Sequence, residues 1–221
     1  MARALSLLFL VACHGAASEP PARSDSPRLS AQVANAARPT WGAASLSPSA
    51  PGAIPAAQPP PEHPLRNPAL RSPLPGGTLA GYRGDTGLDI AADRKPVFAV
   101  APGTLDYSER GHTLWTSGKD TPNSVRLALE TPIAWKGHKI THVYYTHMSV
   151  LTHQMHEGTE PRVVIKAGDA LGVSGVGNGM PHLHIGFLLD GKVEQDSWDG
   201  ILTEADVRVL FGGYRNGEKL P

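Results

Sequence analysis

Short apolar runs recur between residues 96 and 189, and in several of them apolar and polar positions alternate. The runs cover residues 96–100, 103–107, 124–130, 139–147, 162–166, 171–174 and 182–189, and glycine-containing pairs punctuate them. Such runs are typical of β-strands, whose successive side chains point to opposite faces of a sheet. A helical pattern is confined to residues 204–210, with Thr203 as N-cap and Gly212 beyond the end. The pattern predicts an all-β domain of antiparallel strands with one short C-terminal helix.

The chain before these runs has a different composition. Most of the 21 prolines lie before residue 76, and residues 13–79 are rich in alanine, proline and serine. A segment of this kind cannot bury enough apolar surface to order itself, so we expect a disordered, semi-rigid tether over residues 13–79. The folded domain is then expected over residues 80–213, followed by a short tail over residues 214–221.

The N-terminus resembles a bacterial lipoprotein signal. A basic start at Arg3 precedes an apolar run over residues 4–12 that is too short to span a bilayer. Residues 10–13, Leu-Val-Ala-Cys, resemble a lipobox, in which the signal is cut before a cysteine that receives lipid. We interpret residues 1–12 as a signal peptide and Cys13 as a lipid anchor in the bacterial cell envelope, facing the periplasm or the exterior. The alternative is an ordinary signal peptide that happens to contain a cysteine.

Charge and cysteine content narrow the classes of function. The 20 basic residues balance the 20 acidic ones, so no basic stripe exists to follow a phosphate backbone, and we expect no nucleic-acid partner. Cys13 is the only cysteine of the chain. It therefore has no partner for a disulfide within the chain, and no cysteine cluster can bind a metal.

Three segments carry candidate chemistry. Residues 181–187, Pro-His-Leu-His-Ile-Gly-Phe, place His182 and His184 on one face of an extended strand. Such a pair can hold a metal with one imidazole and handle protons with the other; the alternative is two histidines on a solvent face. Asp85 and Asp89 lie four residues apart around a glycine, and His147 closes an alternating strand.

The order of these segments resembles the lysostaphin/LytM-type family of peptidoglycan metallo-endopeptidases. Residues 85–89, Asp-Thr-Gly-Leu-Asp, correspond to the family's HxGxD segment, and residues 144–149, Tyr-Tyr-Thr-His-Met-Ser, to its YxHLS-like segment. Residues 181–186 correspond to PHLHFE, and a glycine-rich loop precedes them. The resemblance covers residues 81–189. It implies an antiparallel β-sandwich or open barrel of the duplicated hybrid motif type.

The resemblance also implies a role for each residue that matches. Asp89 and His184 match metal-ligand positions, while His147 and His182 match the catalytic histidines that flank the water activated by the metal. This agrees with the chemistry of catalytic zinc sites, which use three protein ligands and leave one position open. A nearby imidazole can then take the proton and steady the tetrahedral intermediate.

The sequence departs from the family at two positions. Asp85 stands where the first metal ligand is a histidine, and Gly186 stands where a glutamate is common. Aspartate can bind zinc, but two carboxylates with one imidazole cancel the charge of a divalent ion and should weaken its Lewis acidity. Hard oxygen ligands also relax the preference for zinc over manganese or another divalent metal.

Two functions remain open at this point. The first is a zinc-dependent metallo-endopeptidase that cleaves peptide bonds in peptidoglycan. The second is a catalytically degenerate relative that binds cell wall or activates another cell-wall hydrolase, with an envelope regulatory protein as a candidate partner. The survival of His147 and His182 favours the enzyme, because a binding module needs neither. A passive envelope scaffold would leave these histidines unexplained.

Other histidines have weaker claims. His153 and His156 lie in an apparent insertion over residues 151–161, where we expect polar loop residues with a place for them at the rim of a substrate groove; the alternative is a short helix that carries both on one face as metal ligands. His112, His138 and His142 are interpreted as ordinary surface or strand residues.

Overall fold

The computed structural model describes residues 63–112, 120–193 and 200–221. All of them lie in the compact unit Gly52–Pro221. The expected signal peptide, the lipidation site Cys13 and the tether up to residue 62 lie outside the described residues. Within the described ranges, no helix has the length and apolar character needed to cross a membrane.

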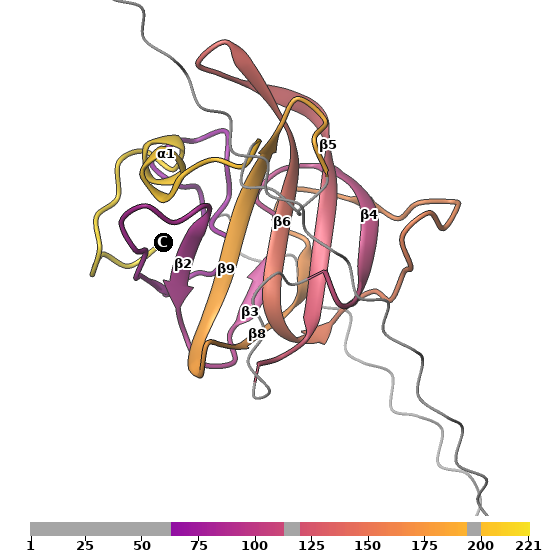
Figure 1. Cartoon of the computed structure of the whole chain (residues 1–221), viewed down its shortest axis with the longest axis horizontal. Coiled ribbons are helices and arrows are strands. Elements are labelled where there is room, and N and C mark those ends of the chain that lie inside the picture. The colour runs from indigo at the N-terminus through magenta and orange to yellow at the C-terminus, as the bar shows by residue number, and fades with distance from the viewer. Residues whose placement is uncertain (1–62, 113–119, 194–199) are drawn as a thin grey trace, which may run out of the picture. The chain divides into compact units, whose positions relative to one another are not determined.

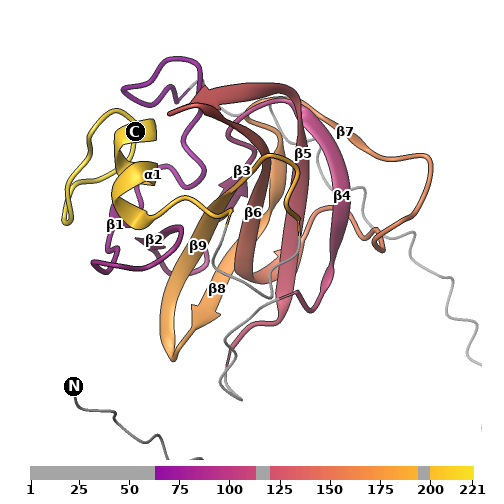
Figure 2. The ribbon, with the colours of Figure 1, turned by 45° about the horizontal axis from the view of Figure 1, so that its top comes forward.

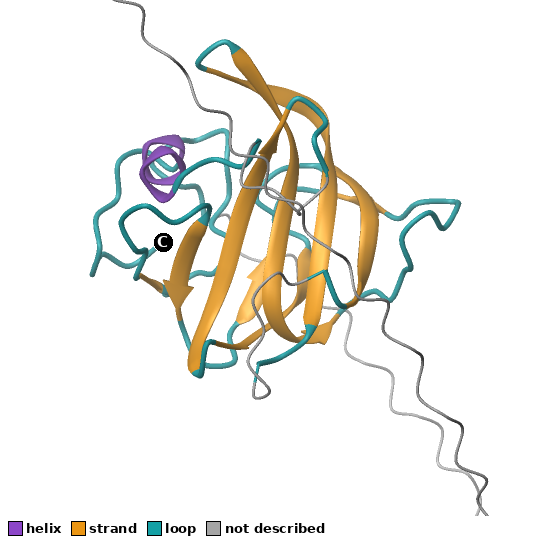
Figure 3. Cartoon of the chain, in the orientation of Figure 1, coloured by secondary structure: helices purple, strands orange, loops and turns teal. Residues whose placement is uncertain are grey.

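Nine strands and one short helix make up the described part of the chain (Figures 1 and 3). The strands are β1 (Thr78–Leu79), β2 (Leu88–Ala91), β3 (Pro96–Phe98), β4 (Gly103–Arg110), β5 (Asn123–Trp135), β6 (His138–Leu151), β7 (Val164–Ile165), β8 (Ala170–Gly177) and β9 (Met180–Leu189), and the helix is α1 (Glu204–Leu210). They form one open antiparallel sheet in the order β1-β2-β9-β8-β6-β5-β4-β7, with β3 beside β8 and a further pairing of β9 with β6. The predicted all-β class is confirmed.

Each predicted strand is present, and α1 spans the predicted residues. The Thr203 hydroxyl accepts from the amide of Asp206, which confirms Thr203 as the N-cap. The hairpin of β5 and β6 is longer than predicted and forms the long bent pair of strands in Figure 2. Strands β1 and β2 were not predicted, because two and four residues are too few for a clear period.

Alternation along the central strands separates an apolar face from a polar one. Buried side chains of β2, β9, β6 and β5 point to the core, namely Leu88, Ile90, Leu183, Ile185, Val143, Tyr145, Val125 and Leu127. Residues directly opposite each other in an antiparallel pair share a face. Asp89 lies opposite His184, and His184 lies opposite Thr146. These three side chains therefore gather on the face opposite the core.

Strand β6 changes its partner at one residue. Up to Thr146, which lies opposite His184, β6 pairs with β9; from Met148, opposite Ser174, it pairs with β8. The residue between, His147, has a φ of 59°, in the left-handed region that residues other than glycine rarely adopt. The sheet thus divides at His147.

The described fold extends on both sides of residues 80–213. The side chains of Leu65, Leu70 and Leu74, from the segment expected as a tether, are buried in the core, as is Leu220 from the expected tail. The amide of Gly76 donates to the carbonyl oxygen of Leu220 at 3.0 Å. Because these leucines supply apolar surface within a proline-rich context, the segments pack onto the domain although their average composition resembles that of a linker.

Candidate metal centre

Asp85, Asp89 and His184 bring one ligand atom each to within 4.8 Å of one another. Asp89 and His184 face each other across β2 and β9, and Asp85 lies in the loop before β2. The His184 Nδ1–H donates to Asp89 Oδ1 at 2.8 Å. The amide of Thr86 donates to Asp85 Oδ1 at 2.8 Å. Among the described residues, no other group of three histidine, cysteine or acidic side chains is this compact.

Gly87, between the two aspartates, allows this close approach. Its φ is 79°, and a Cβ atom there would lie 2.6 Å from His184 Nε2 and 2.7 Å from the carbonyl oxygen of Ile185. Both contacts are too short for real atoms, so any side chain would push the imidazole or the β9 backbone away. Steric contact with β9 therefore explains why glycine stands at the centre of the Asp-Thr-Gly-Leu-Asp segment.

His182 lies on β9 beside this cluster with a defined tautomer. Its Nδ1–H donates to the carbonyl oxygen of Met180 at 2.9 Å, because a carbonyl can only accept. In the neutral ring the lone pair is then on Nε2, which lies 3.7 Å from Asp89 Oδ1. The His182 side chain is buried, and its Nε2, an acceptor in this tautomer, makes no hydrogen bond to the carboxylate at this distance.

His147 borders the cluster from β6. The centroid of its ring lies 4.9 Å from that of His182 and 6.3 Å from that of His184. Its Nδ1 is buried without a hydrogen-bond partner among the described residues. Burial, followed by the charges of His182 and His184, lowers the pKa of His147 to about 4. The ring is therefore neutral at pH 7 and able to accept a proton.

The charge of Asp89 fits a cation site. Burial raises the pKa of this carboxyl, but the hydrogen bond from His184 and the nearby imidazoles lower it more, so that it stays below its usual range. Asp89 is therefore an ionised carboxylate held among histidines.

The donor set suits a divalent cation. Carboxylate oxygens and imidazole nitrogen are ligand types of zinc, and the two carboxylates also suit manganese. The unpartnered His147 Nδ1 and the basic His182 Nε2 lie beside the group without belonging to it. The structure thus brings together all five residues that were named from the sequence, with Asp85, Asp89 and His184 as the group able to hold a metal.

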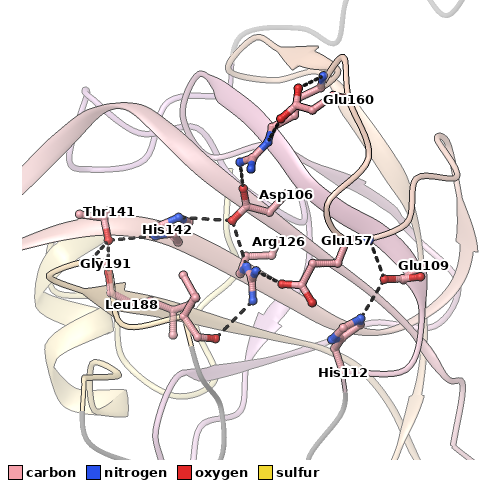
Figure 4. Close-up of polar contacts among 12 residues, drawn as sticks. Asp106, Glu109, His112, Arg126, Thr141, His142, Glu157, Glu160, Leu188 and Gly191 are labelled. Atoms are coloured by element: carbon pink, nitrogen blue, oxygen red, sulfur yellow. Dashed lines mark hydrogen bonds and ion pairs between the residues drawn. The ribbon is translucent and has the colours of Figure 1, made fainter.

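A second polar cluster, which sequence reasoning missed, occupies the same sheet face on β4, β5 and β6 (Figure 4). Arg126 donates from Nε to Asp106 Oδ2 at 3.0 Å and also pairs with Glu157. Asp106 further contacts Arg162 and, at 3.3 Å, Nε2 of His142. We call these five residues the ion network. Contacts between β4, β5 and the loop after β6 have no local signal in the sequence.

We call Asp85, Asp89, His147, His182 and His184 the metal-type cluster. Arg126 places the ion network on the same sheet face as this cluster. Arg126 is two residues from Ser124 along β5, so the two side chains share a face. The Ser124 and Thr146 hydroxyls lie 3.0 Å apart, and Thr146 lies opposite His184. One sheet face therefore carries both polar clusters.

The histidines of the insertion lie away from the metal-type cluster. His156 Nδ1 donates to Glu109 Oε2 at 2.5 Å, and the carbonyl oxygen of His153 accepts from the Ser108 hydroxyl at 2.7 Å. His112 Nε2 donates to Glu109 Oε1 at 2.9 Å. His153 and His156 are therefore loop residues outside the group Asp85, Asp89 and His184, and none of the described residues 152–161 is helical.

No family model and no curated protein match the chain, but several solved structures are similar to it. One similar structure is a peptidase M23 from Pseudomonas aeruginosa, with 19% identity and a TM-score of 0.43 over 68% of this chain and 53% of that one. Another is the catalytic domain of lysostaphin from Staphylococcus simulans, with 22% identity and a TM-score of 0.40 over 61% and 88%. A glycyl-glycine endopeptidase LytM from Ruminococcus gnavus has 22% identity and a TM-score of 0.37 over 64% and 53%. The chain spans about half the length of the first and third of these proteins. By their names they are peptidases of the lysostaphin, LytM and M23 type, the family that the sequence motifs of this chain resemble.

Proposed function

We propose that the chain is a metal-dependent hydrolase that cleaves peptide bonds in peptidoglycan. The observation that carries the proposal is the convergence of Asp85, Asp89 and His184 on one sheet face, with the rings of His147 and His182 beside them. Three ligands and two neighbouring bases are the parts that metal-assisted hydrolysis requires. Peptidoglycan as substrate rests on the resemblance of these segments to the lysostaphin/LytM type.

The proposed roles follow from the environment of each side chain. A divalent ion, zinc in the first instance, would polarise the scissile carbonyl and lower the pKa of a water. Burial lowers the pKa of His147 to about 4, so its ring is neutral at pH 7 and carries a free lone pair, and it is a weaker base than a free imidazole. His182 is held in one tautomer by the Met180 carbonyl and presents its Nε2 to the same space. These two histidines share the tasks of general base and stabiliser of the intermediate.

We further propose the setting of the enzyme. Residues 1–12 act as the signal peptide, Cys13 carries the lipid, and the chain up to the domain is the tether in the bacterial cell envelope. Cross-links or stem peptides of peptidoglycan are then the substrates within reach of the anchored domain. The open groove that the resemblance implies would admit such extended peptides.

The test is hydrolysis of purified cell-wall sacculi by the purified chain loaded with zinc or manganese. We expect release of soluble muropeptides, and a loss of about 100- to 10,000-fold for His147→Ala, because a general acid–base group contributes that much. His153→Ala is the matched control and should retain activity. If neither loaded form releases muropeptides and His147→Ala behaves identically, the chain is not a hydrolase of this kind.

A second candidate is a protein that binds cell wall or activates another hydrolase without catalysis. Asp85 favours this candidate, because two carboxylates and one imidazole cancel the charge of a divalent ion and should weaken its Lewis acidity. In that case the chain would bind sacculi with equal affinity before and after His147→Ala, and would release muropeptides only when a separate cell-wall hydrolase is added.

A further inference from the structure

Thr121 is hydrogen-bonded to His147, the residue at which β6 changes its partner strand, and to Val176 of β8. Its hydroxyl donates to the carbonyl oxygen of His147 at 2.8 Å and lies 3.2 Å from the carbonyl oxygen of Val176. The same hydroxyl accepts from the Val176 amide at 2.9 Å. The Thr121 amide donates to the Val176 carbonyl oxygen at 2.8 Å. A single residue thus connects His147 to β8.

The backbone of His147 needs such a connection. Its φ of 59° is unfavourable for a residue with a side chain and persists where surrounding contacts determine it. His147 is also the residue between the β9-paired and β8-paired parts of β6. The hydroxyl of Thr121 reaches its carbonyl oxygen at this point.

Two glycines of β8 shape the space around this contact. A Cβ atom at Gly175 would lie 2.1 Å from Thr121 Oγ1 and 2.7 Å from the carbonyl oxygen of His147. A Cβ atom at Gly177 would lie 2.4 Å from His147 Cδ2. The first glycine makes room for the hydroxyl and the second for the imidazole, so the β8 backbone fits the orientation of His147 that Thr121 holds.

We propose that Thr121 is a positioning residue for His147. By fixing the His147 carbonyl, the hydroxyl holds the backbone in the left-handed conformation and keeps the imidazole over Gly177, facing His182. The proposal rests on the proposed function, since His147 has to be placed for hydrolysis if the chain is a hydrolase. Misplacing a reacting group by about 1 Å can cost about 100-fold in rate.

The experiment compares Thr121→Val, which removes the hydroxyl at nearly constant volume, with Thr121→Ser, which keeps it. Thr141→Val is the matched control. Thr141 lies in the other half of β6, and its hydroxyl also accepts from a backbone amide, that of Gly191, at 2.9 Å. The first readout is the NMR signals of the His147 ring in the metal-free chain. The second is kcat and KM on soluble cross-linked muropeptides with the zinc-loaded chain.

We expect Thr121→Val to shift the His147 ring signals and lower kcat about 10- to 100-fold, with KM changed less than about twofold. Thr121→Ser should keep the wild-type ring signals and stay within about threefold of the wild-type kcat, as should Thr141→Val. If Thr121→Val does not fold, Thr121→Ala removes the same hydroxyl with a smaller side chain and tests the same contact.

Two results would overturn the positioning role. The first is unchanged His147 ring signals in Thr121→Val or, where that variant does not fold, in Thr121→Ala. The second is a loss in Thr121→Ser as large as in the variant without the hydroxyl. Failure of the proposed function is a separate outcome. A wild-type chain without hydrolysis refutes the hydrolase, while the ring signals still decide whether Thr121 sets the orientation of His147.

Discussion

The two polar clusters on the sheet differ in how their charges are paired. In the ion network, Arg126 and Arg162 lie against Asp106, and Arg126 also pairs with Glu157. In the metal-type cluster, no lysine or arginine of the described residues pairs with Asp85 or Asp89. The metal-type cluster is built on β2, β9 and β6 and the ion network on β4, β5, β6 and the loop after β6, and both lie on one face of the sheet. Because they share a sheet face but few strands, their difference lies in the side chains that each set of strands supplies.

The charged groups of the ion network are paired within the protein, whereas those of the metal-type cluster gain their full set of partners only with a bound cation. A buried carboxylate paired with guanidinium groups needs no further partner. In the metal-type cluster, two carboxylates lie among histidines, and Nδ1 of His147 is buried without a hydrogen-bond partner among the described residues. This cluster has favourable interactions left to make with a cation. The first cluster should therefore dominate stability, and the second should dominate binding.

The largest effect should come from breaking the ion network. Arg126→Met removes the buried one of the two guanidinium groups that pair with Asp106, whose side chain is 8% exposed, and should lower the free energy of unfolding by about 3–5 kcal/mol. Urea denaturation of the metal-free chain measures this. His184→Ala is the counterpart in the other cluster and should cost less than half as much. Equal losses in both variants would remove the distinction between the clusters.

The next effect concerns pH and belongs to the metal-type cluster. The pKa of His147 is about 4 in the folded chain, against about 6.5 when unfolded, so between these values the unfolded state binds the proton and the folded state does not. The stabilisation is complete above pH 6.5 and should fall by about 3 kcal/mol as the pH falls to 4. Denaturation of the metal-free wild type and of His147→Gln at both pH values measures it. A slope that is identical in both proteins would contradict the lowered pKa.

Metal addition should give a somewhat smaller gain. Zinc at about 100 times its dissociation constant should raise the free energy of unfolding by about 2.7 kcal/mol, because a ligand of the folded state stabilises it. His184→Ala should abolish this gain, and Arg126→Met should keep it despite its lower stability. Thermal unfolding with and without zinc distinguishes the variants. A gain that survives in His184→Ala would place the bound zinc elsewhere.

The smallest effect should come from replacing one ligand type by another. Asp85→His exchanges a hard oxygen for a nitrogen ligand and leaves one carboxylate, so zinc should bind about tenfold more tightly, which is about 1.4 kcal/mol. A zinc titration of both proteins with a competing chelator checks this. Equal or weaker binding by the variant would mean that Asp85 does not contribute to the site.

The strands and the shared face of His182 and His184 follow from periodicity alone, because a period of two is local information. Asp89 was predicted as a ligand from the Asp-Thr-Gly-Leu-Asp segment, although β2 was not predicted. The signal for β2 is the alternation of Leu88 and Ile90 around Asp89, and it is too short to identify a strand. The helix was predictable to the residue because Thr203 caps it.

Other features have no local cause. The pairing of Arg126 with Asp106 depends on the register of β4 and β5, which shifts at a bulge between Leu105 and Tyr107. The left-handed backbone of His147 depends on the change of partner strand. Such features arise from contacts between distant segments, so residue patterns cannot specify them.

The joined ends of the domain determine how it bears force. Beside β1, Gly76 and Leu79 donate backbone hydrogen bonds to Leu220 and Glu218. Thr78 also bridges to Lys219. A pull applied at His63 has to break these contacts before it can displace β2. The carboxylate of Asp89 is thus shielded from traction on the N-terminal side of the domain.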